Sequence, residues 1–73
     1  MIPEFKNTNE AITYGRTNKG NEFIIEMLRV ERLKLHAKAL LLMNEEKEQE
    51  AVNLYCQAQF VREAREVADG TYE

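Results

Sequence analysis

The sequence of 73 residues has few of the residue types that cross-link, break or anchor a chain: one Cys, one Pro, three Gly and no Trp. Because Cys56 is the only cysteine, a disulfide within the chain is excluded. The low Gly and Pro content excludes a collagen-like chain, and a hydrophobic fraction of 44% excludes a disordered one. The longest apolar run, residues 39–43, falls far short of the roughly 20 residues that span a bilayer.

The sequence also lacks a positively charged start followed by an apolar segment, so we expect no signal peptide. We therefore predict a soluble, cytoplasmic protein that makes no membrane contact. A formal net charge of −3 argues against a nucleic-acid binder, because such proteins are usually basic. A folded chain of this size buries only about 60% of the surface that its unfolded form exposes. A monomer should therefore be marginally stable.

Residues 21–69 contain neither Gly nor Pro and are rich in strong helix formers. Asn21 is a typical N-cap, and helices often end at a glycine such as Gly70. We expect a turn near Asn44, because Asn is a preferred N-cap and acidic residues follow it at once. One long helix through Asn44 stays the alternative. The predicted fold is all-α, an antiparallel helical hairpin over about 21–43 and 45–69 in a domain that covers 21–70.

Residues 1–20 differ in composition from the rest, since they hold the only Pro and two of the three Gly. Asn7 is suited to cap a helix, with Glu10 as its capping-box partner and Gly15 as the stop. This pattern predicts a short helix over Thr8–Tyr14. We expect this N-terminal arm to be only partly ordered unless its aromatic side chains dock on the helices.

The apolar residues of the first long helix fall on two stripes when the helix is drawn at about 100° per residue. The first stripe holds Phe23, Met27, Val30, Leu33, Ala37, Leu40 and Leu41, and the second holds Ile24, Leu28, Leu35 and Leu42. A helix in a two-helix hairpin needs only one such stripe. The extra stripe predicts a homodimer that closes as a four-helix bundle. The expected interface residues are Phe23, Ile24, Met27, Leu28, Leu35, Leu42 and Phe60.

The charges fit an antiparallel pair of helices. A turn at Asn44 places Lys38 opposite Glu50 and Glu26 opposite Arg62, and both pairs are opposite in charge. An exposed ion pair contributes only about 0.2–1 kcal/mol to stability. We therefore expect these pairs to select the register of the two helices more than to stabilise them.

Nucleic-acid binding by a helical dimer is the alternative function. Residues 29–38 carry a local excess of positive charge, and contacts to phosphates require such cations. The net acidity of the whole chain makes this function less favoured than assembly. The candidate contacts are Arg29, Arg32, Lys34, His36 and Lys38.

The residues needed for catalysis or metal binding are missing. His36 is the only histidine, and no His-x-x-x-His, Glu-x-x-His or Cys-x-x-Cys spacing occurs. Cys56 lies on an apolar stripe of the second helix, so a buried, inert thiol is expected. We predict no enzyme activity and no cofactor. The predicted function is that of a small helical assembly module, a regulator or adaptor, whose partner is a second copy or another protein.

Overall fold

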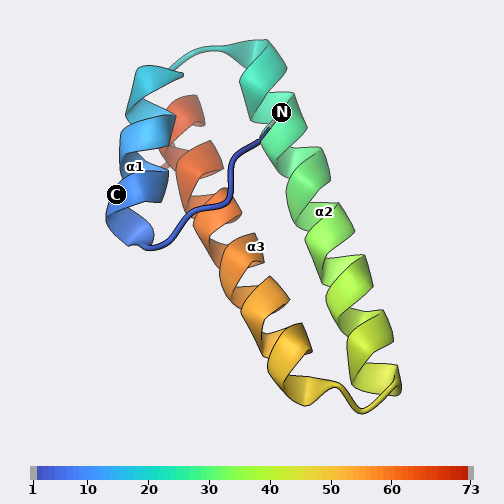
Figure 1. Ribbon diagram of the computed structural model, residues 1–73. Coiled ribbons are helices and arrows are strands. Elements are labelled where there is room, and N and C mark those ends of the chain that lie inside the picture. Colours follow the sequence, from blue (N-terminus) through green and yellow to red (C-terminus); the bar gives the residue numbers. More distant parts are fainter. Residues whose placement is uncertain (1, 73) are drawn as a thin grey trace.

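The computed structural model describes residues 2–72, and this part of the chain is all-helical, with no strand. The predicted all-α class is confirmed. The helices are α1 (Thr8–Thr17), α2 (Glu22–Asn44) and α3 (Glu48–Asp69). Figure 1 shows α2 and α3 side by side, joined by a short turn, with α1 next to the C-terminal half of α3.

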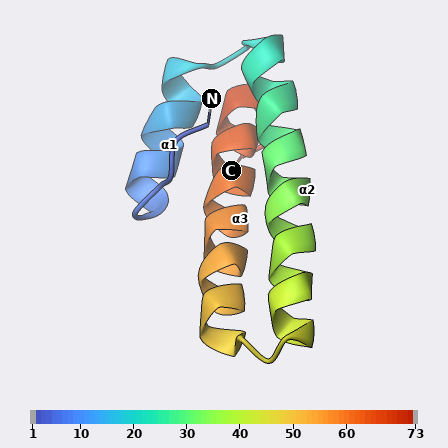
Figure 2. The same ribbon diagram turned by 45° about the vertical axis from the view of Figure 1, so that its right-hand side comes forward.

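In both views α3 stands between α1 and α2 (Figures 1 and 2), and the fold is as deep as it is wide, with extents of 38 × 21 × 21 Å. Both α1 and α2 pack against α3, and the two views agree on this order (Figures 1 and 2). The extended segment 2–6 runs from the side of α2 across α3 to the start of α1 (Figure 1). In this arrangement the side of α2 away from α3 has no neighbouring helix.

Asn7 caps α1 as predicted, whereas Glu10 binds the backbone of the residue before the cap and not that of Asn7 itself. The Asn7 Oδ1 atom accepts a hydrogen bond from the Glu10 backbone N–H at 2.9 Å, and the Glu10 carboxylate accepts one from the Lys6 N–H at 2.9 Å. The predicted end at Gly15 was wrong, because α1 continues to Thr17. Gly15 instead allows a close approach to α3, since a Cβ there would lie 2.5 Å from the Ala64 carbonyl oxygen.

The turn between α2 and α3 lies later than predicted. Asn44 is the last residue of α2 and does not cap the next helix. The Lys47 N–H donates to the Leu42 carbonyl at 2.8 Å, and the Glu46 N–H donates to the Met43 carbonyl at 3.0 Å. These two bonds form a Schellman motif, which satisfies the last carbonyls of α2. Glu46 takes the left-handed position of this motif, with a φ of 64°.

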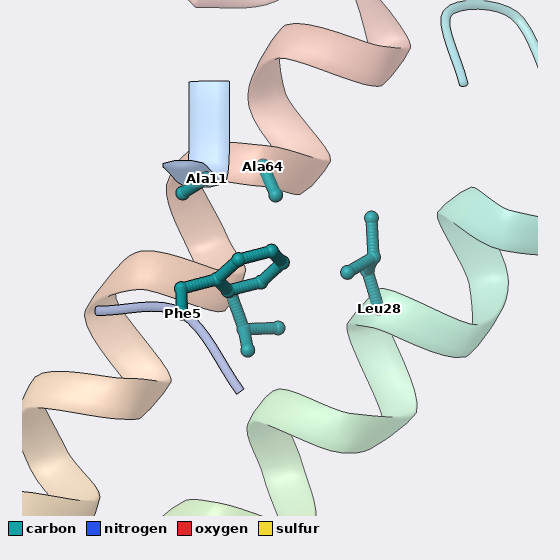
Figure 3. Close-up of a cluster of buried hydrophobic side chains, with 5 residues drawn as sticks. Phe5, Ala11, Leu28 and Ala64 are labelled. Carbon is teal, nitrogen blue, oxygen red and sulfur yellow. The ribbon is translucent and has the colours of Figure 1, made fainter. Parts of the chain in front are cut away.

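The core collects side chains from every segment of the fold. Phe5 from the N-terminal segment, Ala11 from α1, Leu28 from α2 and Ala64 from α3 point toward one another (Figure 3). The Phe5 N–H donates to Gln57 Oε1 at 3.1 Å, and Gln57 Nε2 donates back to the Phe5 carbonyl. The N-terminal arm is therefore packed into the same core as the long helices.

Small residues on α3 bring its neighbours close. Ala51 and Ala58 are fully buried, and so is Ala64. The largest fully buried side chains are only Leu28 and Val61. Because the buried residues of α3 are mostly small, the helices pack closely but the core is small. Most of the large apolar side chains of α2 lie outside it.

Candidate interaction surface on α2

The outer side of α2 carries large apolar side chains that the rest of residues 2–72 leaves uncovered. Their exposed fractions are 72% for Phe23, 56% for Leu33, 58% for Leu40 and 62% for Leu41. We call these four residues the outer stripe. By contrast, Leu28 on the inner side of the helix is fully buried. One apolar side of α2 therefore packs inside the chain, and the other faces outward.

The start of α2 and its contacts with α3 set which side faces outward. The Asn21 Oδ1 atom accepts a hydrogen bond from the Ile24 N–H at 3.2 Å, as the N-cap prediction required. Leu28 enters the core, and Leu35 packs against it. At about 100° per residue, Leu33 lies about 160° around the helix from Leu35. Packing Leu35 inward therefore turns Leu33 away from α3.

The predicted interface residues separate into two groups. Leu28 lies in the core, and Ile24, Leu35 and Phe60 pack against it. Leu28 is fully buried within the chain and does not lie at its surface. Ile24, Leu35 and Phe60 keep part of their surface exposed, so their place in an interface between two chains stays a prediction. Phe23 is exposed, whereas Met27 and Leu42 are half-buried.

Leu33, Leu40 and Leu41 were absent from the predicted interface, although they expose more than half of their surface. They belong to the first apolar stripe found by helical periodicity. The predicted interface instead contains residues of both stripes. The helix turns the first stripe outward almost as a unit.

A groove of about 530 Å³ runs beside the outer stripe at the start of α2. It is lined by Ile2 of the N-terminal segment and by Phe23, Met27 and Val30 of α2. Lys34 lines it too. The groove continues the apolar surface of the outer stripe toward the N-terminal segment.

The ion pairs found in residues 2–72 connect near neighbours in sequence. Arg29 Nε donates to Glu26 Oε1 at 3.2 Å, and Arg62 Nε lies 3.4 Å from Glu66 Oε2. The predicted Glu26–Arg62 pair is therefore replaced by two local pairs. The rings of His36 and Tyr55 instead meet across the two helices, with centroids 5.5 Å apart. The residues of the turn, 45–47, shift the register from the one predicted.

The other predicted pair also does not form. Lys38 and Glu50 line one shallow hollow between α2 and α3. Within the described residues, however, no ion pair joins them, and the remaining pairs are Lys47–Glu45 and Arg65–Asp69.

The hydrogen bonds between Glu26 and Arg29 shift the pKa values of both side chains. The hydrogen bond from Arg29 lowers the pKa of Glu26, with a further contribution from the positive charge of Arg29. The same bond raises the pKa of Arg29. Both side chains are solvent-exposed, so water screens the pair strongly. The pair fixes two charges at the edge of the outer stripe.

The candidate nucleic-acid contacts do not share one face of α2. Lys34 lines the groove with Ile2, on the side of the N-terminal segment. His36 lies about half a helical turn away and contacts Tyr55. Arg29 lies on the same side as His36 and is paired with Glu26. Lys38 lies near Lys34, and Arg32 lies nearer to His36.

Cys56 is exposed, so the predicted burial of its thiol was wrong. Among residues 2–72, no group of three or more His, Cys, Asp or Glu side chains is placed to hold a metal ion. None of the helices in this range is both long and apolar enough to cross a membrane.

Comparisons of this chain with protein-family models, with curated proteins and with solved structures find no match.

Proposed function

We propose that this protein is a small, non-catalytic assembly module that forms a homodimer through the outer side of α2. The observation that carries the proposal is the outer stripe, whose four large side chains each expose more than half of their surface. Contiguous exposed apolar surface is typical of protein–protein contact sites. A regulator or adaptor of the cytoplasm would use such a surface to bring two copies, or a copy and another protein, together.

The position of the outer stripe determines how two copies meet. It lies nearly opposite α3, so a second chain that covers it contacts α2 and not the groove between α2 and α3. The dimer then has α2 against α2, with α3 outside on each side. This side-by-side arrangement of four helices replaces the compact four-helix bundle expected from the sequence.

The expected strength of association follows from the exposed area. Fully burying a Leu or Phe side chain contributes roughly 1.5–3 kcal/mol, so covering the exposed half contributes about 1 kcal/mol. A dimer covers two outer stripes, but association costs several kcal/mol of lost translational and rotational freedom. The net gain is therefore well below the gross ~8 kcal/mol, and we expect a weak, concentration-dependent dimer with a Kd of roughly 0.1–1 mM, which corresponds to about 4–5 kcal/mol.

Sedimentation equilibrium across a concentration series tests the proposal. The unmodified chain should change from monomer mass to dimer mass as concentration rises. The variant Leu33→Glu/Leu40→Glu should stay monomeric, because two carboxylates would be buried in the contact. The control Asn9→Glu/Gln59→Glu adds the same charge at exposed positions of α1 and α3 and should still dimerise. A native chain that stays monomeric at millimolar concentration would contradict the proposal.

A further inference from the structure

The outward side of α2 carries a line of residues with a symmetrical pattern of polarity. The spacing along this line alternates between four and three residues, which keeps it on one side of a helix. Its members are Glu26, Val30, Leu33, Ala37, Leu40 and Asn44. Polar residues stand at both ends of this six-residue line and apolar residues stand between them, so its polarity reads alike in both directions along the helix. The exposed Phe23 stands one further step, three residues, before Glu26 on the same side of α2.

We propose that the two copies pair antiparallel along this line, about a two-fold axis near the middle of α2; this inference rests on the proposed homodimer. Leu33 then packs against Ala37 of the second copy, and Val30 packs against Leu40 of the second copy. Each contact occurs twice because the interface is isologous. Glu26 meets Asn44 of the second copy at each end, beyond the apolar contacts.

Side-chain size supports this register. Ala37 is the smallest residue of the line, and it faces Leu33, which exposes 56% of its surface. The smaller Val30 likewise faces Leu40, which exposes 58%. Alternating large and small residues let two helices interdigitate at close distance.

Charge disfavours the parallel arrangement, although the Arg29 guanidinium already pairs with the Glu26 carboxylate within each copy. A parallel pair in register would place Glu26 against Glu26 of the second copy inside the contact, and like charges brought together oppose association. The antiparallel pair instead places each Glu26 beside the amide of Asn44, which can donate a hydrogen bond to the carboxylate. Antiparallel helices also bring opposite ends of their dipoles together.

The flanks of the contact remain open to water. The antiparallel register brings the two Lys34 side chains near the axis on one flank and the two His36 side chains near it on the other. Both residues are exposed in the single chain. A long Lys side chain can lie along an apolar surface and keep its ammonium group in water. These residues therefore border the seam and do not enter it.

Disulfide trapping with single-cysteine variants tests the orientation. In a Cys56→Ser background, one chain carries Glu26→Cys and the other carries Asn44→Cys. Oxidation of an equimolar mixture should give mainly the mixed disulfide, identified by its mass. Each variant alone should cross-link at least several-fold less, because like positions lie roughly 27 Å apart in the antiparallel pair.

Two trapping results would overturn the register. Efficient disulfides between two copies of Glu26→Cys would show a parallel pair. A mixture of Phe23→Cys and Leu41→Cys chains that cross-links better than the first mixture would show a different antiparallel register. A cysteine pair on α3, Asn53→Cys with Gln59→Cys, serves as the control for random collision.

The mass of the unoxidised cysteine variants separates the two proposals. Dimer mass with the wrong disulfide pattern overturns the antiparallel register and leaves the homodimer in place. Monomer mass at every concentration, for these variants and for the unmodified chain, overturns both.

Discussion

Gly15 in α1 lies against Val67 in α3 so closely that a Cβ atom at residue 15 would be 2.6 Å from the Val67 Cβ. This contact holds α1 on α3 although Gly is a poor helix former. The approach also brings Ala11 of α1 into the core beside Ala64 of α3. The close packing of α1 against α3 therefore depends on the absence of a side chain at residue 15.

Gly15→Ala should destabilise the protein by a net ~1–2 kcal/mol, because the added methyl group would lie 2.5 Å from the Ala64 carbonyl oxygen and overpack the contact between the helices. The gain in helix propensity, about 1 kcal/mol, acts in the opposite direction and is too small to compensate. Urea unfolding followed by circular dichroism measures the difference. Asn9→Ala, at an exposed position of the same helix, is the control and should change stability by less than the Gly15 variant.

Glu46→Gly should stabilise the protein by about 1 kcal/mol. Glu46 has a φ of 64°, and the left-handed conformation costs a residue with a Cβ about 1–2 kcal/mol. Glycine avoids that cost but loses more entropy on folding. Glu45→Gly, where φ is −91°, should not stabilise. Equal shifts in the urea midpoint for the two variants would contradict the assigned turn.

Gln57→Ala should release the N-terminal segment from α3. The side chain of Gln57 pairs with both the N–H and the carbonyl of Phe5, and each such bond contributes about 0.5–1.5 kcal/mol. Amide hydrogen exchange should show faster exchange at Phe5 in this variant. Gln59, two residues further along α3, is exposed, and Gln59→Ala should leave that exchange rate unchanged.

The Glu26–Arg29 pair should give a measurable pH signature. Because the pKa of Glu26 is lowered from its ordinary 4.5, the pair stabilises α2 at pH values above 4.5. That contribution is lost as the pH falls through the lowered pKa. Carboxyl NMR titration should show the pKa of Glu26 rising toward its ordinary value in Arg29→Gln. Lys34→Gln removes a charge elsewhere on α2 and should leave the pKa lowered.

Local signals were sufficient to predict the starts of α1 and α2 but not the turn or the start of α3. Asn7 and Asn21 cap α1 and α2 by accepting hydrogen bonds from the backbone N–H groups three residues later. The sequence of those few residues is therefore enough to predict where each helix begins. The turn depends on Glu46 adopting a left-handed conformation, which glycine usually provides. A glutamate gives no sequence sign of that geometry, and Asn44 was therefore mistaken for an N-cap.

The contacts that decide which side of α2 is buried could not be predicted from a sequence pattern. Both stripes of α2 are apolar, so periodicity alone did not say that Leu28 would be buried and Leu33 exposed. The bond between Phe5 and Gln57 joins residues 52 positions apart. It orders an arm whose composition had suggested partial order. Long-range packing of this kind depends on the whole chain, whereas caps depend on a single turn.

A dilution series observed by methyl NMR tests the central claim most directly. If two copies meet through α2, the methyl shifts of Leu33, Leu40 and Leu41 should change together with concentration and fit one monomer–dimer equilibrium. The methyl groups of Val52, which is exposed on α3, should not follow that curve. Shifts of the α2 methyl groups that are independent of concentration up to about the millimolar range, or changes confined to Val52, would contradict association through the outer stripe.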